Sequence, residues 1–173
     1  MEAARQAAAS DNWFAALAIA LTLPDICGAV DDPGTNNSKA RYVTWWDRYM
    51  ADHYRCTPDE DEEWYEPFTY LPGSEAYALR CAYLHSGTDD VDRNGSVMKR
   101  IGFLGPPSSA HLGFDEQNRK LNVGLEQFVE WVCVGVETWL AQHQGDPIIE
   151  ARLDGLVAII PSAIRLVGRP TQP

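Results

Sequence analysis

The chain has 173 residues, a formal net charge of −11 and a hydrophobic content of 45%. This length predicts one domain over residues 1–173 with a core of its own, and the composition excludes a largely disordered chain. The acidic charge argues against a protein that coats DNA or RNA without specificity, because it repels phosphate backbones.

The N-terminal third predicts two helices. Residues 2–23 are rich in alanine and leucine, with Ser10 or Asp11 as a helix cap, and Pro24 and Gly28 punctuate this segment. After a turn region, Ser38 is the expected cap of a second helix, which carries tryptophans and tyrosines and ends near Tyr54.

The middle of the chain predicts an exposed acidic loop followed by a third helix. The loop is the run Asp59 to Glu63, which lies between two prolines. Ser74 is the candidate N-cap of the helix, and Glu75 favours its positive dipole end. Gly87 is the expected C-terminal stop.

The C-terminal half is irregular at first and then helical. Residues 101–104 and 111–114 are expected as two short strands, which leaves room for a short β-hairpin near residues 100–114. An apolar stripe predicts a helix from Leu121 to His143, and residues 148–160 predict a final helix. The predicted fold class is therefore all-α, a single-domain helical bundle.

Cysteine usage and apolar runs predict a cytoplasmic protein without a metal or a membrane partner. The four cysteines form no C-x-x-C pair, so no structural zinc site is expected, and no sequence motif calls for a cofactor. The apolar run from Ala15 to Leu23 is too short to span a bilayer, and the N-terminus lacks the regions of a signal peptide.

The run from Tyr77 to Gly87 holds the strongest candidate site. It places Arg80 and His85 at the predicted end of the third helix. Arginine binds phosphate bidentately and histidine transfers protons near neutral pH. Five helical steps set the two side chains about 140° apart, so we expect them to converge only where the helix ends or distorts, or where a second subunit completes the site.

This run resembles the Arg-x4–6-His signature of the HEPN superfamily, a group of small all-helical proteins that are often homodimeric. Many members are metal-independent endoribonucleases of toxin–antitoxin, phage-defence and CRISPR systems. The resemblance implies that Arg80 contacts the scissile phosphate and that His85 transfers a proton as the ribose 2′-hydroxyl attacks. It also implies that two copies face one composite cleft. The position after the arginine, often polar in active members, is Cys81 here.

Several alternatives stay open beside this resemblance. Arg80 and His85 are also the residues of an ordinary salt bridge and a satisfied helix end. Arg48 and His53 have the same spacing, and Arg41 is a further residue for a local basic cleft. The alternative function is that of a non-catalytic helical protein-interaction module, which the acidic charge favours.

Other acidic groups in the sequence are further candidate sites. Residues 90–95 match the first half of an EF-hand loop, but its twelfth position is Ile101 rather than an acid, so a polar turn is expected. Asp25 and Asp47 are candidates to orient an arginine or histidine, with ordinary salt bridges as the simpler expectation. The acidic run is a candidate surface for a basic partner or inhibitor protein.

Overall fold

The computed structural model describes residues 1–56, 68–92, 96–106 and 112–157. Within these ranges the chain forms a mixed α/β domain, in which six α-helices are joined by two small sheets. The prediction of an all-α bundle is therefore wrong. The α-helices are α1 (Glu2–Ala9), α2 (Trp13–Asp31), α3 (Ser38–Tyr49), α4 (Gly73–Ser86), α5 (Leu125–Gln142) and α6 (Pro147–Asp154), with a 3-10 helix η1 (Ala51–Tyr54) after α3.

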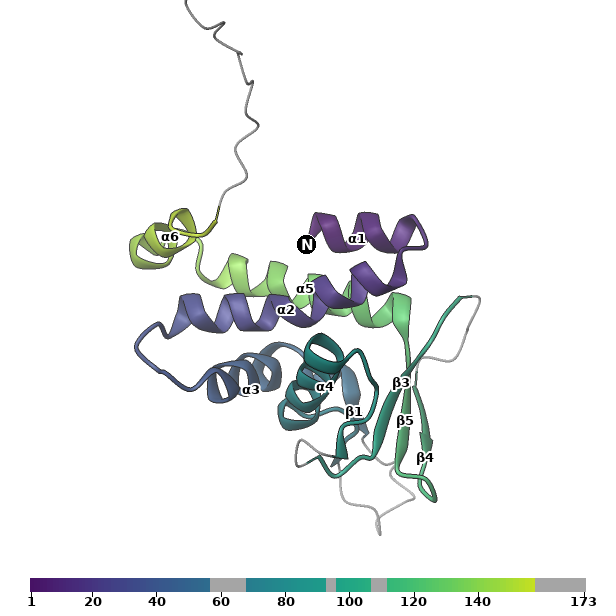
Figure 1. Cartoon of the computed structure of the whole chain (residues 1–173). Helices are drawn as coiled ribbons and strands as arrows, with labels where there is room; N and C mark the ends of the chain where they lie inside the picture. The colour runs from purple at the N-terminus through teal and green to yellow at the C-terminus, as the bar shows by residue number, and fades with distance from the viewer. Residues whose placement is uncertain (57–67, 93–95, 107–111, 158–173) are drawn as a thin grey trace, which may run out of the picture.

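Helix α2 lies at the centre of the molecule. It contacts α1, α3, α4, α5 and α6, and Figure 1 shows it running alongside α5 with α3 and α4 on the opposite side from α1. Pro24 and Gly28 in the sequence predict a break in this helix, but the helix continues through both residues as far as Asp31. Gly28 is needed there because a Cβ would lie 3.0 Å from the backbone oxygen of Arg41 in α3.

Helix α2 is also longer than the apolar run from Ala15 to Leu23, so its length alone no longer excludes a membrane span. Its 19 residues have a mean hydropathy of 1.8, which is long and apolar enough to cross a membrane. However, part of its apolar surface packs against the other helices, where Ala16, Ala20 and Leu21 are fully buried. This packing is consistent with the core helix of a soluble protein.

The helix ends differ in detail from the sequence prediction. Asn12, rather than Ser10 or Asp11, caps α2 through a bond from Ala15 N, and Asn37 caps α3 in the same way. Helix α4 has Pro72 at its N-cap position and no side-chain cap. Its predicted stop is confirmed: Gly87 has φ +61°, a left-handed conformation that glycine adopts without strain.

The larger sheet, at one end of α5 in Figure 1, has the strand order β3-β5-β4. Strand β5 is central and pairs parallel with β3 and antiparallel with β4. The two strands expected near residues 100–114 exist, but they flank β5 instead of pairing as a hairpin. The strands are β1 (Arg55–Cys56), β2 (Phe68–Thr69), β3 (Arg100–Leu104), β4 (Leu112–Asp115) and β5 (Lys120–Gly124), of which β1 and β2 form a separate pair.

Strand β5 occupies the start of what the sequence predicts as one long helix. Leu121 and Val123 are fully buried and alternate with half-buried residues, which is the pattern of a strand. Gly124 then forms the N-cap position of α5. Because Leu121 also fits the helical stripe of α5, the pattern alone did not separate strand from helix.

Aromatic side chains fill the space between α3, α4 and α5. Tyr42 and Trp46 are fully buried and stacked, with ring centroids 6.1 Å apart, and Trp46 donates its indole N–H to Leu71 O. Gly73 places the start of α4 directly on α3, because a Cβ there would lie 2.8 Å from Val43 O. This contact fixes the position of α4 and therefore of the residues near its end.

Candidate functional site

Arg80 and His85 converge at the C-terminal end of α4. Arg80 Nη1 lies 3.0 Å from His85 Nε2. Helix α4 continues through Ser86, so an early helix end does not bring them together. The reach of the long arginine side chain bridges the angle instead. Gly87 then closes the helix, and its N–H donates to Tyr83 O.

Asp25 of α2 completes what we call the Arg80 cluster, which consists of Asp25, Arg80 and His85. Arg80 Nε donates to Asp25 Oδ2 at 2.6 Å, and the two side chains are only about a fifth exposed, at 21% and 20%. Burial disfavours the charge of Arg80, but the Asp25 carboxylate outweighs that effect and raises the pKa of Arg80. Asp25 therefore holds the guanidinium in a fixed orientation.

The contact between Arg80 and His85 defines the state of the imidazole. A guanidinium only donates hydrogen bonds, so His85 Nε2 must accept and carries no proton in this arrangement. The proton of the neutral ring is then on Nδ1. His85 is exposed, so its ring is open to a ligand. An unprotonated Nε2 beside a fixed cation is equipped to accept a proton next to a bound anion.

The guanidinium of Arg80 retains capacity for another acceptor. Asp25 takes Nε, His85 takes Nη1 and the Cys81 side chain is a further hydrogen-bond partner. A guanidinium has five N–H donors, so these three partners leave donors for a ligand. The adjacent Cys81 is half-buried and contributes to raising the pKa of Arg80. Tyr42 lies beneath the cluster, and burial raises the pKa of its phenol well above the usual value, with the charge of Asp25 adding to that shift.

The second arginine–histidine pair found by spacing is not joined in the structure. Arg48 reaches Gln142 on α5 at 3.3 Å, whereas His53 stacks on Trp131 with ring centroids 4.5 Å apart. Burial lowers the pKa of His53. Arg41 donates to the backbone oxygen of Thr35, so the three arginines considered for a basic cleft have separate partners.

The two aspartates singled out in the sequence have different roles. Asp25 orients Arg80, as described above. Asp47 accepts a bond of 2.7 Å from Gly73 N and so anchors the first residue of α4. The acidic run of residues 59–63 lies outside the described residues.

The EF-hand-like segment is described only in part, since residues 93–95 lie outside the described ranges. Asp90 N bonds to Thr88 Oγ1, and Asp92 N bonds to Asp90 Oδ1 at 3.3 Å, which is turn geometry. Among the described residues, no group of three or more His, Cys, Asp or Glu side chains is placed to hold a metal ion.

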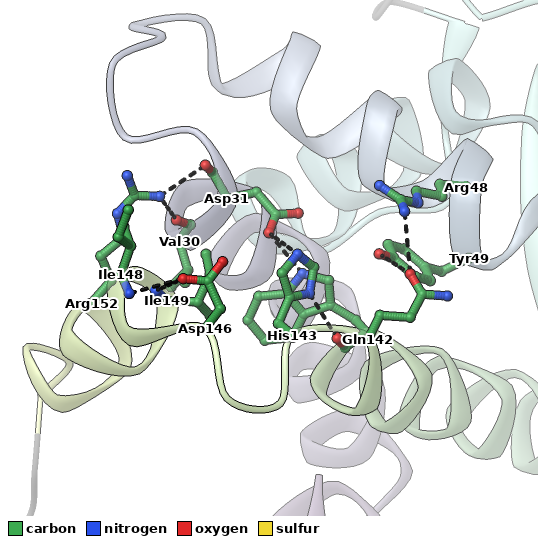
Figure 2. Close-up of polar contacts among 11 residues, drawn as sticks. Val30, Asp31, Arg48, Tyr49, Gln142, His143, Asp146, Ile148, Ile149 and Arg152 are labelled. Atoms are coloured by element: carbon green, nitrogen blue, oxygen red, sulfur yellow. Dashed lines mark hydrogen bonds and ion pairs between the residues drawn. The ribbon is translucent and has the colours of Figure 1, made fainter.

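A second polar cluster, which the sequence patterns did not indicate, joins α2 to α5 (Figure 2). We call it the Asp31 cluster; it consists of Asp31, Trp139 and His143. The indole N–H of Trp139 donates to Asp31 Oδ1 at 2.8 Å, and His143 Nε2 lies 3.6 Å from the same oxygen. His143 Nδ1 donates to Trp139 O at 2.8 Å. Both nitrogens of this imidazole therefore face a partner within the protein.

Helix α6 closes the Asp31 cluster from outside. Figure 2 shows Arg152 pointing at the end of α2, where it donates to Val30 O at 2.7 Å and Asp31 O at 3.0 Å. A cation at a helix C-terminus satisfies free carbonyls and the negative dipole end. Asp146 caps α6 through Ile148 N and Ile149 N. The Asp31 cluster is therefore a structural clamp, by which we mean that its contacts hold the C-terminal end of α2 against α5 and α6.

No protein-family model, curated protein or solved structure matches the chain. The geometry of the two clusters is therefore the basis for a proposed function.

Proposed function

We propose that the protein is a metal-independent endoribonuclease, resembling HEPN proteins in its site, that uses Arg80 and His85. The supporting observation is the 3.0 Å contact between Arg80 Nη1 and His85 Nε2 on an exposed helix end. A fixed cation beside an unprotonated imidazole is the pair that transesterification of RNA needs. Neither role calls for a metal ion or a cofactor.

The chemistry follows from the two contacts of Arg80. A phosphate that binds the guanidinium competes for Nη1 and frees His85 Nε2. That nitrogen takes the proton of the ribose 2′-hydroxyl as the oxygen attacks phosphorus and the bond to the 5′-oxygen breaks. Arg80 stabilises the charge that develops on the phosphate oxygens. The leaving oxygen takes a proton from water or from the site of a second subunit.

The remaining parts of the proposal follow the same resemblance. Two copies form a homodimer whose Arg80 clusters face one cleft, in a cytoplasmic toxin–antitoxin or phage-defence setting. The formal net charge of −11 weakens non-specific binding of RNA. It also suits a basic partner protein that inhibits the enzyme.

A non-catalytic protein-interaction module is the second candidate. The observation that favours it is the ion pair between Arg80 Nε and Asp25 Oδ2, which neutralises the arginine and joins α4 to α2. In that case Arg80 ties two helices together and His85 only satisfies a helix end. The acidic charge favours this candidate as well.

Cleavage of a mixed RNA pool in the presence of EDTA distinguishes the two candidates. We expect the wild type to cleave, with products ending in a 2′,3′-cyclic phosphate. The His85→Ala variant should lose a factor of at least about 10² in rate, the low end of what general acid–base catalysis contributes. Its circular dichroism should match the wild type because His85 is exposed. Equal cleavage by a folded variant would rule out the role of His85, and no cleavage by either protein would favour the interaction module.

A further inference from the structure

Strand β3 has an outer edge that is only partly paired. It is the first strand in the order β3-β5-β4, so only one of its two sides faces another strand of the sheet. On the outer side, Asp90 bridges Arg100, Ile101 N donates to Asp89 O, and Val91 N donates to Lys99 O. These contacts cover the beginning of β3 and stop at Ile101.

The backbone groups of Phe103 face the same outer side. Alternate residues of a strand direct their N–H and C=O groups to opposite neighbours, and Ile101 N points away from β5. Two residues later, Phe103 repeats that direction. The segment before Asp89 does not continue the pairing, because the N–H groups of Gly87 and Thr88 are used to cap α4. Among the residues that the structure describes, no backbone group pairs with this stretch of the strand edge.

An apolar pocket of about 420 Å³ lies beside this stretch of β3. Its walls come from the start of α2, the last turns of α4 and the first residue of α5. Pockets of 300–1,000 Å³ with mostly apolar walls are typical of binding sites. The apolar lining residues include Trp13, Leu17, Leu79, Tyr83, Phe103 and Leu125.

An aromatic side chain at the rim of the pocket is also exposed to solvent. Phe14 lines the pocket and is 80% exposed. Tyr83 Oη donates to the backbone oxygen of Phe14 at 3.1 Å, so the main chain at Phe14 is held against α4. A large exposed aromatic side chain beside an apolar pocket is typical of an interaction surface.

We propose that the outer edge of β3 and this pocket bind an extended peptide segment of a partner protein. The segment adds a strand beside Phe103, and one bulky apolar side chain enters the pocket against Phe14. A peptide backbone pairs with both the N–H and the C=O groups of a strand edge, whereas a lipid or hydrocarbon leaves them unpaired. The net charge of −11 favours basic residues on either side of the apolar one.

The probe for the test is a fluorescent heptapeptide of alternating valine and threonine, with lysine at both ends and a central phenylalanine, tyrosine or leucine. We expect saturable binding measured by fluorescence anisotropy. Phe14→Ala should weaken binding by about tenfold or more, as loss of a buried aromatic contact predicts. Ile148→Ala is the matched control, because Ile148 is also a large exposed apolar side chain but lies on α6, and it should bind as the wild type does.

Backbone methylation tests whether the peptide binds as a strand. Two probes carry N-methyl groups on alternate residues, one along each edge of the peptide. A paired strand uses one edge, so one methylated probe should lose binding and the other should keep it.

Three results would overturn the proposal. The first is equal binding of both methylated probes, and the second is no binding of any probe at about 1 mM. The third is a dimer of this chain that Phe14→Ala dissociates, because a second copy would then occupy the surface. The proposal goes beyond the ribonuclease proposal, and His85→Ala should leave peptide binding unchanged.

Discussion

The Arg80 cluster and the Asp31 cluster are built alike but differ in what they leave available. Each joins an aspartate of α2 to a histidine at the end of another helix, α4 in one case and α5 in the other. In the Asp31 cluster, His143 faces a carbonyl on one nitrogen and a carboxylate on the other. In the Arg80 cluster, an arginine stands between the acid and the histidine, and His85 is exposed.

This contrast in available hydrogen-bond atoms indicates which histidine is suited to proton transfer. A side chain whose polar atoms are all used by the protein contributes to stability and to a defined packing. A histidine that accepts from a cation and faces water can exchange that contact for a ligand. We therefore propose that the Asp31 cluster serves stability and that the Arg80 cluster serves reactivity, and most of the predictions below test that division.

The largest expected effect concerns Arg80, which is compared with another arginine that pairs with an aspartate. Arg80→Ala should lower RNA cleavage by at least about 10², because the variant loses the cation that stabilises the transition state. Arg100→Ala is the matched control, since Arg100 also pairs with an aspartate, Asp89, at 2.6 Å but lies at the sheet. The initial rates at which the two variants cleave one RNA substrate measure both effects. Equal losses in the two variants would remove the special role of Arg80.

The next effect concerns stability in the Asp31 cluster. Trp139→Phe removes the indole N–H that binds the Asp31 carboxylate and leaves a small cavity, so the free energy of unfolding should fall by about 2–4 kcal/mol. Trp13→Phe, at a half-buried tryptophan, should cost less than about 1 kcal/mol. Urea denaturation of both variants checks this. If Trp139→Phe lowered the free energy of unfolding by less than the control does, the stabilising role of the Asp31 cluster would be contradicted.

A smaller effect of pH comes from His53, which belongs to neither cluster. Burial lowers its pKa in the folded state, so the unfolded chain binds more protons below about pH 6.5. The free energy of unfolding should therefore fall as the pH drops through 6.5 towards the lowered pKa. His53→Gln should reduce this pH dependence in urea titrations at several pH values. An unchanged dependence would assign it to other groups, including those of the two clusters.

The smallest effect is a difference between two thiols, one beside each cluster. Burial, together with the charge of Asp31, raises the pKa of Cys27 to about 12, so its reactive thiolate is rare at neutral pH. Cys81 is half-buried next to Arg80. Iodoacetamide should modify Cys81 at least about tenfold faster than Cys27, as measured by mass spectrometry of the folded protein. Faster labelling of Cys27 would mean that the end of α2 opens.

Local signals in the sequence predicted several elements well. Gly87 ends α4 because a left-handed residue is needed there, and residues 101–104 lie within β3. The all-α prediction failed at β5, where Leu121 fits a strand and a helix equally. The parallel pairing of β3 with β5 depends on tertiary contacts, and no local pattern encodes it.

The candidate site was predictable only in part. The spacing of Arg80 and His85 indicated a pair, and the structure joins them, whereas their catalytic role stays a prediction. The ion pair with Asp25 connects residues 55 positions apart. The Asp31 cluster gave no signal either, because Trp139 and His143 resemble ordinary residues of an amphipathic helix until α2 packs against them.

The measurement that tests the division most directly compares His85→Ala with His143→Ala in two assays, RNA cleavage in EDTA and thermal unfolding. We expect His85→Ala to lose cleavage by at least about 10² with little change in unfolding temperature. We expect His143→Ala to keep its cleavage rate but to unfold several degrees lower, as a loss of about 1 kcal/mol implies. If His85→Ala retained cleavage and lost stability instead, the Arg80 cluster would be a structural clamp like the Asp31 cluster, and the proposed function would be wrong.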